Sequence, residues 1–199
     1  MRWPTLLDTA ANDSFDVLTT VAVADADWTR RAEGLDWSCR TTLDHLVEGL
    51  LCYTAQLGTG AADSWTALLG GLRPDAAIRD CLAGVRAAAA LLSAAVRHAD
   101  PADRGWHPWG VADAAGFAAM GMVELTVHTG DLARALGADW RPDPGVCAAA
   151  VDRLFPEAPA GDPVAALWWC TGRGELPGHP RRRGWQWRGG VPDRSRSGN

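Results

Sequence analysis

Three histidines of this chain follow an acidic residue by four positions, a spacing that places both side chains on one face of a helix. Only Glu124 and His128 lie within a strongly helical pattern, because Gly105 interrupts one of the other spacers and Pro177 the other. A carboxylate on an apolar helix needs a partner or a cation, since desolvating its charge is costly. The pair therefore predicts either a metal site or an acid–histidine pair satisfied by hydrogen bonds.

A third ligand is expected from another helix, because two ligands leave a metal ion under-coordinated. His45 is the natural candidate, with Gly49 beside it to leave room for an ion; the alternative is a histidine on the helix surface. Glu124, His128 and Asp131 share one helical stripe. Asp131 is therefore predicted to orient His128, or a substrate, from outside the ligand set.

Two imidazoles and one carboxylate match the ligands of a catalytic zinc site that keeps one coordination position open. Such a site lowers the pKa of a bound water or a bound thiol, and a bound thiolate would be a nucleophile at neutral pH. The same ligands also suit nickel, iron or manganese, so their spacing does not identify the metal.

A further histidine, His107, lies in a segment rich in tryptophan and proline, Trp106 to Trp109, which is expected to form a loop over one end of the fold. If this loop covers a ligand, His107 would be a general base or a substrate contact. The alternative is a loop histidine exposed to water.

The elements that must position these residues are predicted to be helices, because apolar residues recur at helical spacing. The expected helices span residues 4–28, 39–57, 74–98 and 113–136. Four long helices predict a bundle, and the long connection of about residues 58–73 predicts one crossover. Two short helices should follow Asp143 and Asp162, each a capping residue with proline after it.

The domain organisation predicted from these elements has three parts. Residues 1–140 form the metal-binding bundle, residues 141–190 a short C-terminal extension packed on it, and residues 191–199 a disordered tail. Within the extension, Trp185 to Trp187 alternate like a short strand or an extended segment.

Composition excludes several classes of protein. A net charge of −5 argues against a nucleic-acid partner, and no uncharged segment is long enough to span a membrane. Acidic residues interrupt the N-terminal stretch where a signal peptide needs an apolar core. Five cysteines without a C-x-x-C motif fit reduced thiols, so a cytoplasmic protein with a small-molecule substrate is expected. Whether the chain forms a homodimer is left open.

Two segments resemble one known family. Trp37-Ser38 followed by Thr41-Thr-Leu-Asp-His45-Leu-Val, and Met122-Val-Glu124-Leu-Thr-Val-His128-Thr-Gly-Asp131-Leu-Ala-Arg-Ala-Leu-Gly137, resemble the DinB/YfiT-like metalloprotein superfamily. The closest branch is the actinobacterial one, of the mycothiol-dependent maleylpyruvate isomerase type. Residues 162–173 are similar to the tail of that branch. All 19 basic residues are arginine, which agrees with a GC-rich genome.

The resemblance implies an all-α, DinB-like four-helix bundle with a crossover connection, plus short C-terminal helices and a tail. It also implies a metal held by His45, Glu124 and His128. The expected function is an enzyme that activates a low-molecular-weight thiol, such as mycothiol, for S-transfer to a small electrophile or for isomerisation of one. A non-catalytic metal- or small-molecule-binding module and a metal-dependent hydrolase are the alternatives.

Overall fold

The computed structural model describes residues 2–23, 26–68 and 70–191, and within these ranges the chain forms helices and no β-strand. The helices are α1 (Arg2–Val23), α2 (Cys39–Thr59), α3 (Ile78–His98), α4 (Ala114–Leu136), α5 (Pro144–Leu154) and α6 (Pro163–Cys170). The predicted all-α class, with long bundled helices and short C-terminal ones, is confirmed.

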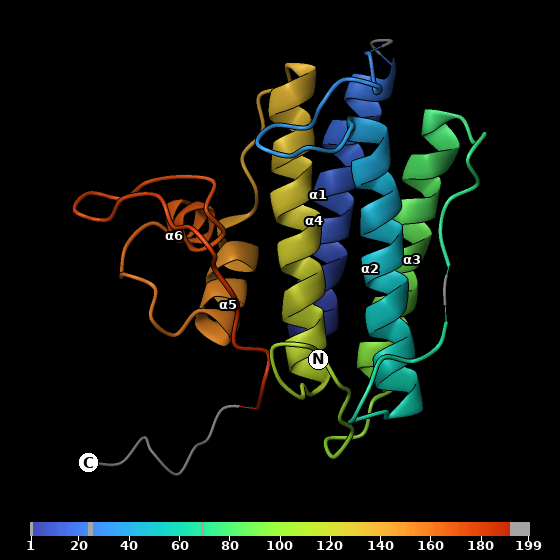
Figure 1. Ribbon diagram of the computed structural model, residues 1–199, viewed down its shortest axis with the longest axis vertical. Helices are drawn as coiled ribbons and strands as arrows, with labels where there is room; N and C mark the ends of the chain where they lie inside the picture. Colours follow the sequence, from blue (N-terminus) through green and yellow to red (C-terminus); the bar gives the residue numbers. More distant parts are fainter. Residues whose placement is uncertain (1, 24–25, 69, 192–199) are drawn as a thin grey trace.

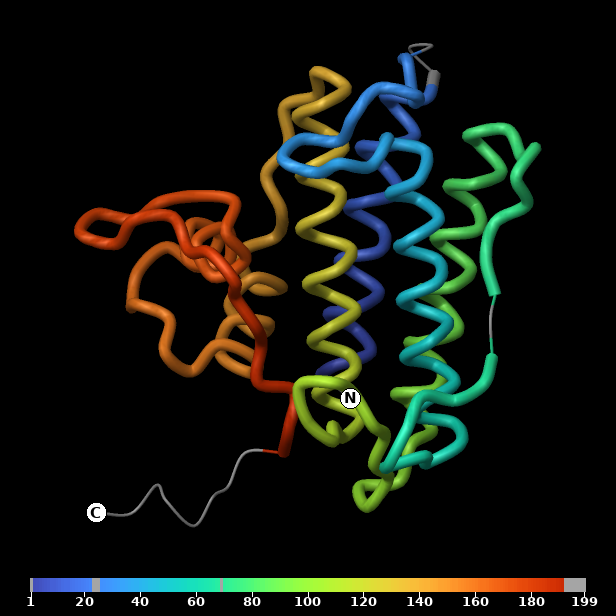
Figure 2. Tube along the Cα trace, in the orientation of Figure 1, coloured from blue at the N-terminus to red at the C-terminus, as the bar shows by residue number. Residues whose placement is uncertain are grey.

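The four long helices form a bundle in which α1 and α2 each pack against both α3 and α4. Figure 1 shows α1 and α4 running upward, and α2 and α3 running downward. Because α2 and α3 are parallel, the chain between them must return along the whole bundle. Figure 2 shows this connection beside α3, and it is the predicted crossover.

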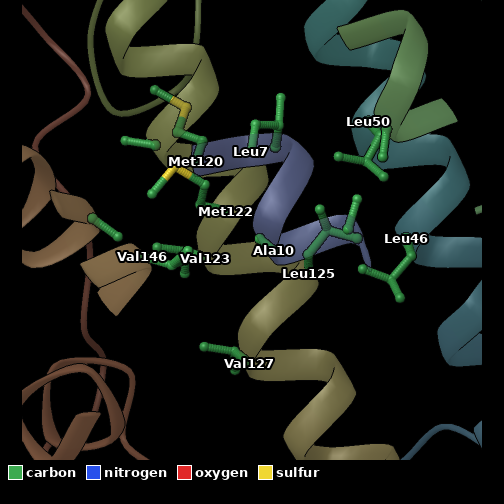
Figure 3. Close-up of a cluster of buried hydrophobic side chains, with 14 of the residues drawn as sticks. Leu7, Ala10, Leu46, Leu50, Met120, Met122, Val123, Leu125, Val127 and Val146 are labelled. Atoms are coloured by element: carbon green, nitrogen blue, oxygen red, sulfur yellow. The ribbon is translucent and has the colours of Figure 1, made fainter. Parts of the chain in front are cut away.

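Helix α4 is buried around almost its whole circumference. Helices α1 and α2 cover one side of it, and α5 covers the other. In Figure 3, Leu125 of α4 lies on the side of Leu46, whereas Val123 faces Val146 of α5. This arrangement explains the apolar sequence of α4. Any polar side chain on this helix is shielded from water and needs a partner.

Capping residues set the starts of the later helices. The side chains of Asp113, Asp143 and Asp162 each accept a hydrogen bond from a backbone N–H three residues further on. The predicted starts of α4, α5 and α6 are confirmed, and α4 ends as predicted at Gly137, which adopts the left-handed conformation.

Two predicted helix ends are wrong. The first helix ends at Val23 instead of continuing to Trp28, and just before Trp28 the Asp27 side chain accepts hydrogen bonds from Thr29 in a local turn. The third helix begins at Ile78 instead of Pro74. Pro74 belongs to a separate turn, which is closed by a hydrogen bond from the N–H of Ala76 to the C=O of Arg73, three residues earlier.

The C-terminal part packs on the outer face of α4 through α5, and α6 packs on α5 (Figure 1). Residues 185–187 belong to neither a helix nor a strand, so the predicted short strand is absent there. The predicted tail lies outside the described residues from residue 192 onward. No helix of the described ranges combines the length and apolar character needed to cross a bilayer. All five cysteines are free.

Candidate metal centre

Three side chains from two neighbouring helices meet at one point of the bundle. The Nε2 atom of His45, on α2, lies 3.3 Å from Oε2 of Glu124, on α4. The Nε2 atom of His128, one turn further along α4, lies 3.2 Å from the same oxygen. The predicted convergence of these residues is therefore present in the structure.

The spacing of the donor atoms fits a single metal ion. Two ligand atoms bound to one tetrahedral zinc ion stand about 3.3–3.5 Å apart, given zinc–ligand bonds of about 2.0–2.2 Å. The distances from Oε2 to the two imidazole nitrogens are close to this value, and all three donor atoms lie within 4.8 Å of one another. The three residues could therefore share a cation.

Glu124 carries the negative charge of the centre, and its side chain is only 11% exposed. Its second oxygen, Oε1, accepts a hydrogen bond from the Tyr53 hydroxyl at 3.1 Å, which leaves Oε2 facing the histidines. Burial alone would raise the pKa of Glu124, but hydrogen bonds and charge from His128 and His45 hold it well below its usual range.

No arginine contacts Glu124 within the described ranges, so the balancing charge must come from protonated histidine or from a bound cation. A divalent cation supplies that charge while leaving both histidines neutral.

The buried carboxylate of Asp131 holds His128 from the other side. Its Oδ2 atom lies 3.2 Å from Nδ1 of His128, so Nδ1 carries a proton and Nε2 is the atom directed at Glu124. A carboxylate behind a metal-binding imidazole fixes the tautomer and the ring orientation in this way. The structure therefore places Asp131 beside His128, and its role as a positioning residue stays a prediction.

Two arginines neutralise Asp131, which is completely buried. Arg173, after α6, donates to both carboxylate oxygens, at 2.8 and 3.3 Å. Arg134, one turn beyond Asp131 on α4, donates at 3.1 Å. Helical spacing could have identified Arg134. Arg173 is 42 residues distant along the chain, and no local pattern connects it with the metal centre.

Trp37, from the segment before α2, borders the centre on a side that faces solvent. Its ring lies 4.9 Å from the His45 ring and 6.5 Å from the His128 ring. Trp37 is 42% exposed, so it covers the centre without sealing it.

The centre is also bordered by a cavity of about 520 Å³ beside α2, here called the α2 cavity. It extends from His45 to His107 and is bounded by α2, by part of the crossover connection and by the loop before α4. Its lining residues are His45, Glu48, Gly49, Leu51, Cys52, Tyr53, Trp65, Leu68, Gly70 and His107. A ligand in this space would therefore touch one of the candidate metal ligands directly.

Gln56 connects the two loops that border the α2 cavity. Its completely buried amide donates to the backbone oxygens of Ser64 and Trp106, and its Oε1 accepts from the N–H of Thr66. The sequence indicated no role for Gln56, because the partners of its amide come from connections that carry no periodic pattern.

His107 is buried, so the alternative of a loop histidine exposed to water is wrong. Only 7% of the residue is exposed, because aromatic rings surround it. The centroids of Tyr53, Trp65, Trp109 and Trp187 lie between 5.5 and 6.1 Å from its ring centroid. Trp187 belongs to the C-terminal segment after α6, far along the chain from His107, which explains why the sequence did not predict this burial.

We expect the burial of His107 to make the protein sensitive to acid. Burial lowers the pKa of His107 from 6.5 to about 4, with the Glu124 carboxylate opposing the shift. The unfolded chain takes up this proton below pH 6.5, whereas the folded protein resists it down to about pH 4. Stability present above pH 6.5 is therefore lost as the pH falls towards 4.

The measurement for this prediction is urea unfolding of the wild type and His107→Gln at pH 7 and pH 4.5. The wild type should lose about 1–2 kcal/mol more than the variant, after allowance for solvent screening. Equal losses would contradict the prediction, because carboxyl groups common to both proteins would then explain the acid sensitivity.

The other two acid–histidine spacings form no ion pair within the described ranges; only Glu124 and His128 do so at that separation. Comparison with models of protein families, with curated proteins and with solved structures finds no match for this chain. The family resemblance therefore stays a prediction from the sequence motifs.

Proposed function

We propose that this protein is a metal-dependent enzyme that activates a low-molecular-weight thiol, such as mycothiol, for S-transfer to a small electrophile or for its isomerisation. The observation that carries the proposal is the position of the three candidate ligands. They share one point in the bundle, and one of them, His45, also lines the α2 cavity. A purely structural metal site would be closed by protein ligands, whereas this one borders space for a small molecule.

His45, Glu124 and His128 would hold the ion, and we propose zinc, with nickel, iron or manganese suited to the same atoms. When bound, a divalent cation lowers the pKa of a thiol, so that a thiolate is available at neutral pH. The chain's own residues prepare the site for this. Tyr53 fixes one oxygen of Glu124, and Asp131 fixes the ring of His128.

The nucleophile is proposed to be an external thiol, because the cysteine of the α2 cavity is poorly suited to the role. Cys52 lines the cavity, but burial raises the pKa of its thiol. In the proposed reaction, the external thiol gives up its proton to solvent and its sulfur bonds to an electrophilic carbon. In S-transfer, that carbon expels a leaving group with its bonding electron pair. In isomerisation, the electron pair of a carbon–carbon double bond shifts towards a conjugated carbonyl oxygen, and after rotation about that bond the pair returns and expels the thiolate.

The sequence motifs shared with the DinB/YfiT-like superfamily support the same proposal, because thiol-dependent reactions are what that resemblance implies. A cytoplasmic location is proposed with it, since free cysteines and reduced cosubstrate thiols both persist in a reducing compartment.

We expect the His45→Ala variant to lose bound metal and thiol-dependent turnover while it keeps its fold. His45 is partly exposed and contributes one of three ligands, so its removal should disturb the core little. The measurements are metal content of the purified protein, circular dichroism, and consumption of mycothiol with monobromobimane as the electrophile. His98→Ala is the matched control, because His98 is exposed at the end of α3 and should be dispensable.

The same experiment separates the alternatives. Metal binding without turnover of mycothiol or another thiol would indicate a non-catalytic module. Turnover of an ester or amide without any thiol would indicate a metal-dependent hydrolase. Metal-free wild-type protein with unchanged thiol turnover would overturn the proposal.

A further inference from the structure

His107 lies at the end of the α2 cavity opposite His45, and its protonation state follows from its hydrogen bond. The Nδ1 atom of His107 accepts a hydrogen bond from the backbone N–H of Trp109 at 3.1 Å. An amide N–H can only donate, so Nδ1 presents its lone pair and carries no proton. In a neutral imidazole the proton must then be on Nε2.

The Nε2–H group of His107 has no hydrogen-bond partner within the described ranges. The residue is 93% buried, lines the α2 cavity and is held among aromatic rings, which offer no conventional acceptor. A donor on a mostly buried residue that opens onto a cavity is satisfied only when a ligand or a water accepts from it. The arrangement therefore indicates an acceptor within the cavity.

We infer that His107 is a neutral hydrogen-bond donor, and that its Nε2–H binds a carbonyl oxygen of a small, uncharged, mostly apolar ligand in the α2 cavity. This inference deepens the proposed function and rests on it for the identity of the ligand as the electrophile. Of the two roles predicted for His107 from the sequence, it favours the substrate contact over the general base. A general base needs a free lone pair, and the lone pair of His107 is already used by the Trp109 amide.

The electrostatics of His107 agree with this assignment. Its burial lowers its pKa to about 4, so the ring stays neutral at physiological pH and keeps a single N–H. A neutral imidazole held in place can stabilise negative charge that develops on an oxygen without first having to reorganise. This is the charge that appears when a thiolate adds to a carbon conjugated with a carbonyl group.

The lining of the α2 cavity favours an uncharged ligand. The cavity contains the carboxylate of Glu48, and no arginine is among its lining residues. A carboxylate at the His107 end would find no positive side chain to pair with, and burying an unpaired charge is unfavourable; the proposed cation lies at the opposite end, beside His45. Leu51, Trp65 and Leu68 instead offer apolar surface for the body of the ligand. A neutral ketone, aldehyde or enone fits these features.

The first test measures the ring tautomer of His107 directly in the full-length wild type. Long-range ¹H–¹⁵N spectra at pH 7, assigned by comparison with His107→Phe, should show a neutral ring protonated on Nε2. A ring protonated on Nδ1, or on both nitrogens, would overturn the inference.

The second test measures selectivity for the oxygen. Binding of acetophenone is compared with binding of 2-phenylpropene, in which a methylene group replaces the carbonyl oxygen, by quenching of tryptophan fluorescence. The wild type should prefer acetophenone, and His107→Phe should reduce that preference about five- to tenfold. His107→Gln, whose amide can place an N–H near the Nε2 position, should restore part of it. An unchanged preference in His107→Phe would overturn the inference.

Both compounds are tested with protein as purified and after metal removal, which keeps the two proposals distinguishable. Loss of selectivity in His107→Phe together with absence of metal and thiol turnover would contradict only the proposed function. Metal binding and thiol turnover together with unchanged selectivity would contradict only the role of His107.

Discussion

Replacing Glu124 with glutamine is expected to remove the stabilisation that zinc confers on the wild-type protein. An ion that binds only the folded state raises the free energy of unfolding by about 2.7 kcal/mol when its concentration is 100 times its dissociation constant. The glutamine side chain keeps the size of Glu124 and can still accept from Tyr53, but it has no charge to attract the cation. The effect of zinc should therefore nearly vanish.

The measurement is urea unfolding with and without added zinc, after metal removal with a chelator. Glu157→Gln is the matched control, because Glu157 pairs with Arg182 and Arg188 and is far along the chain from the three ligands. Equal stabilisation of wild type and Glu124→Gln by zinc would show that zinc binds elsewhere. In that case, His45, Glu124 and His128 would form a network of hydrogen bonds that binds no zinc.

Replacing Arg173 with methionine is expected to lower the free energy of unfolding by about 3 kcal/mol. Removal of one partner from a buried ion pair costs about 3–5 kcal/mol, because the remaining charge stays desolvated. Asp131 would still have Arg134 and His128 beside it, so the lower end of that range applies. Methionine fills a similar apolar volume, and the loss should therefore reflect the charge.

Arg141→Met is the control for this prediction. Arg141 pairs with Asp162 at 2.7 Å, but both side chains are largely exposed, and such a pair contributes about 1 kcal/mol or less. Chemical denaturation of the three proteins at pH 7 gives the comparison. Similar losses in Arg173→Met and Arg141→Met would mean that Asp131 is solvated, and that the C-terminal part does not support the metal centre.

Glu124 and Asp131 contact the two opposite nitrogen atoms of the His128 ring. On the side of Asp131, every charge has a partner from the protein, so His128 is held rigidly. On the side of Glu124, the balancing charge is left to a cation or to protons on the histidines. Beyond His45, the α2 cavity then provides room for a ligand, and His107 provides a donor at the far end. Asp131 and its arginines thus form a rigid support for His128, whereas the His45 side of the centre is open to a ligand.

Features that depend on neighbours along the chain could be read from the sequence. Glu124 and His128 share a helix face because four residues make about one turn, and this holds wherever the helix packs. Asp113, Asp143 and Asp162 cap helices through backbone groups only three residues away. The class of the fold follows in the same way, from apolar residues repeated at helical spacing.

Features that join distant parts of the chain were decided by the tertiary structure. The sequence only suggested that His45 pairs with Glu124. The packing of α2 beside α4 brings the two side chains together. Tyr53, Arg173 and the burial of His107 had no local signal at all. Arg173 reaches Asp131 only because α5 and α6 bring the C-terminal part back onto α4. The tautomer of His107 depends on a loop conformation, and loops lack the periodicity that makes helices predictable.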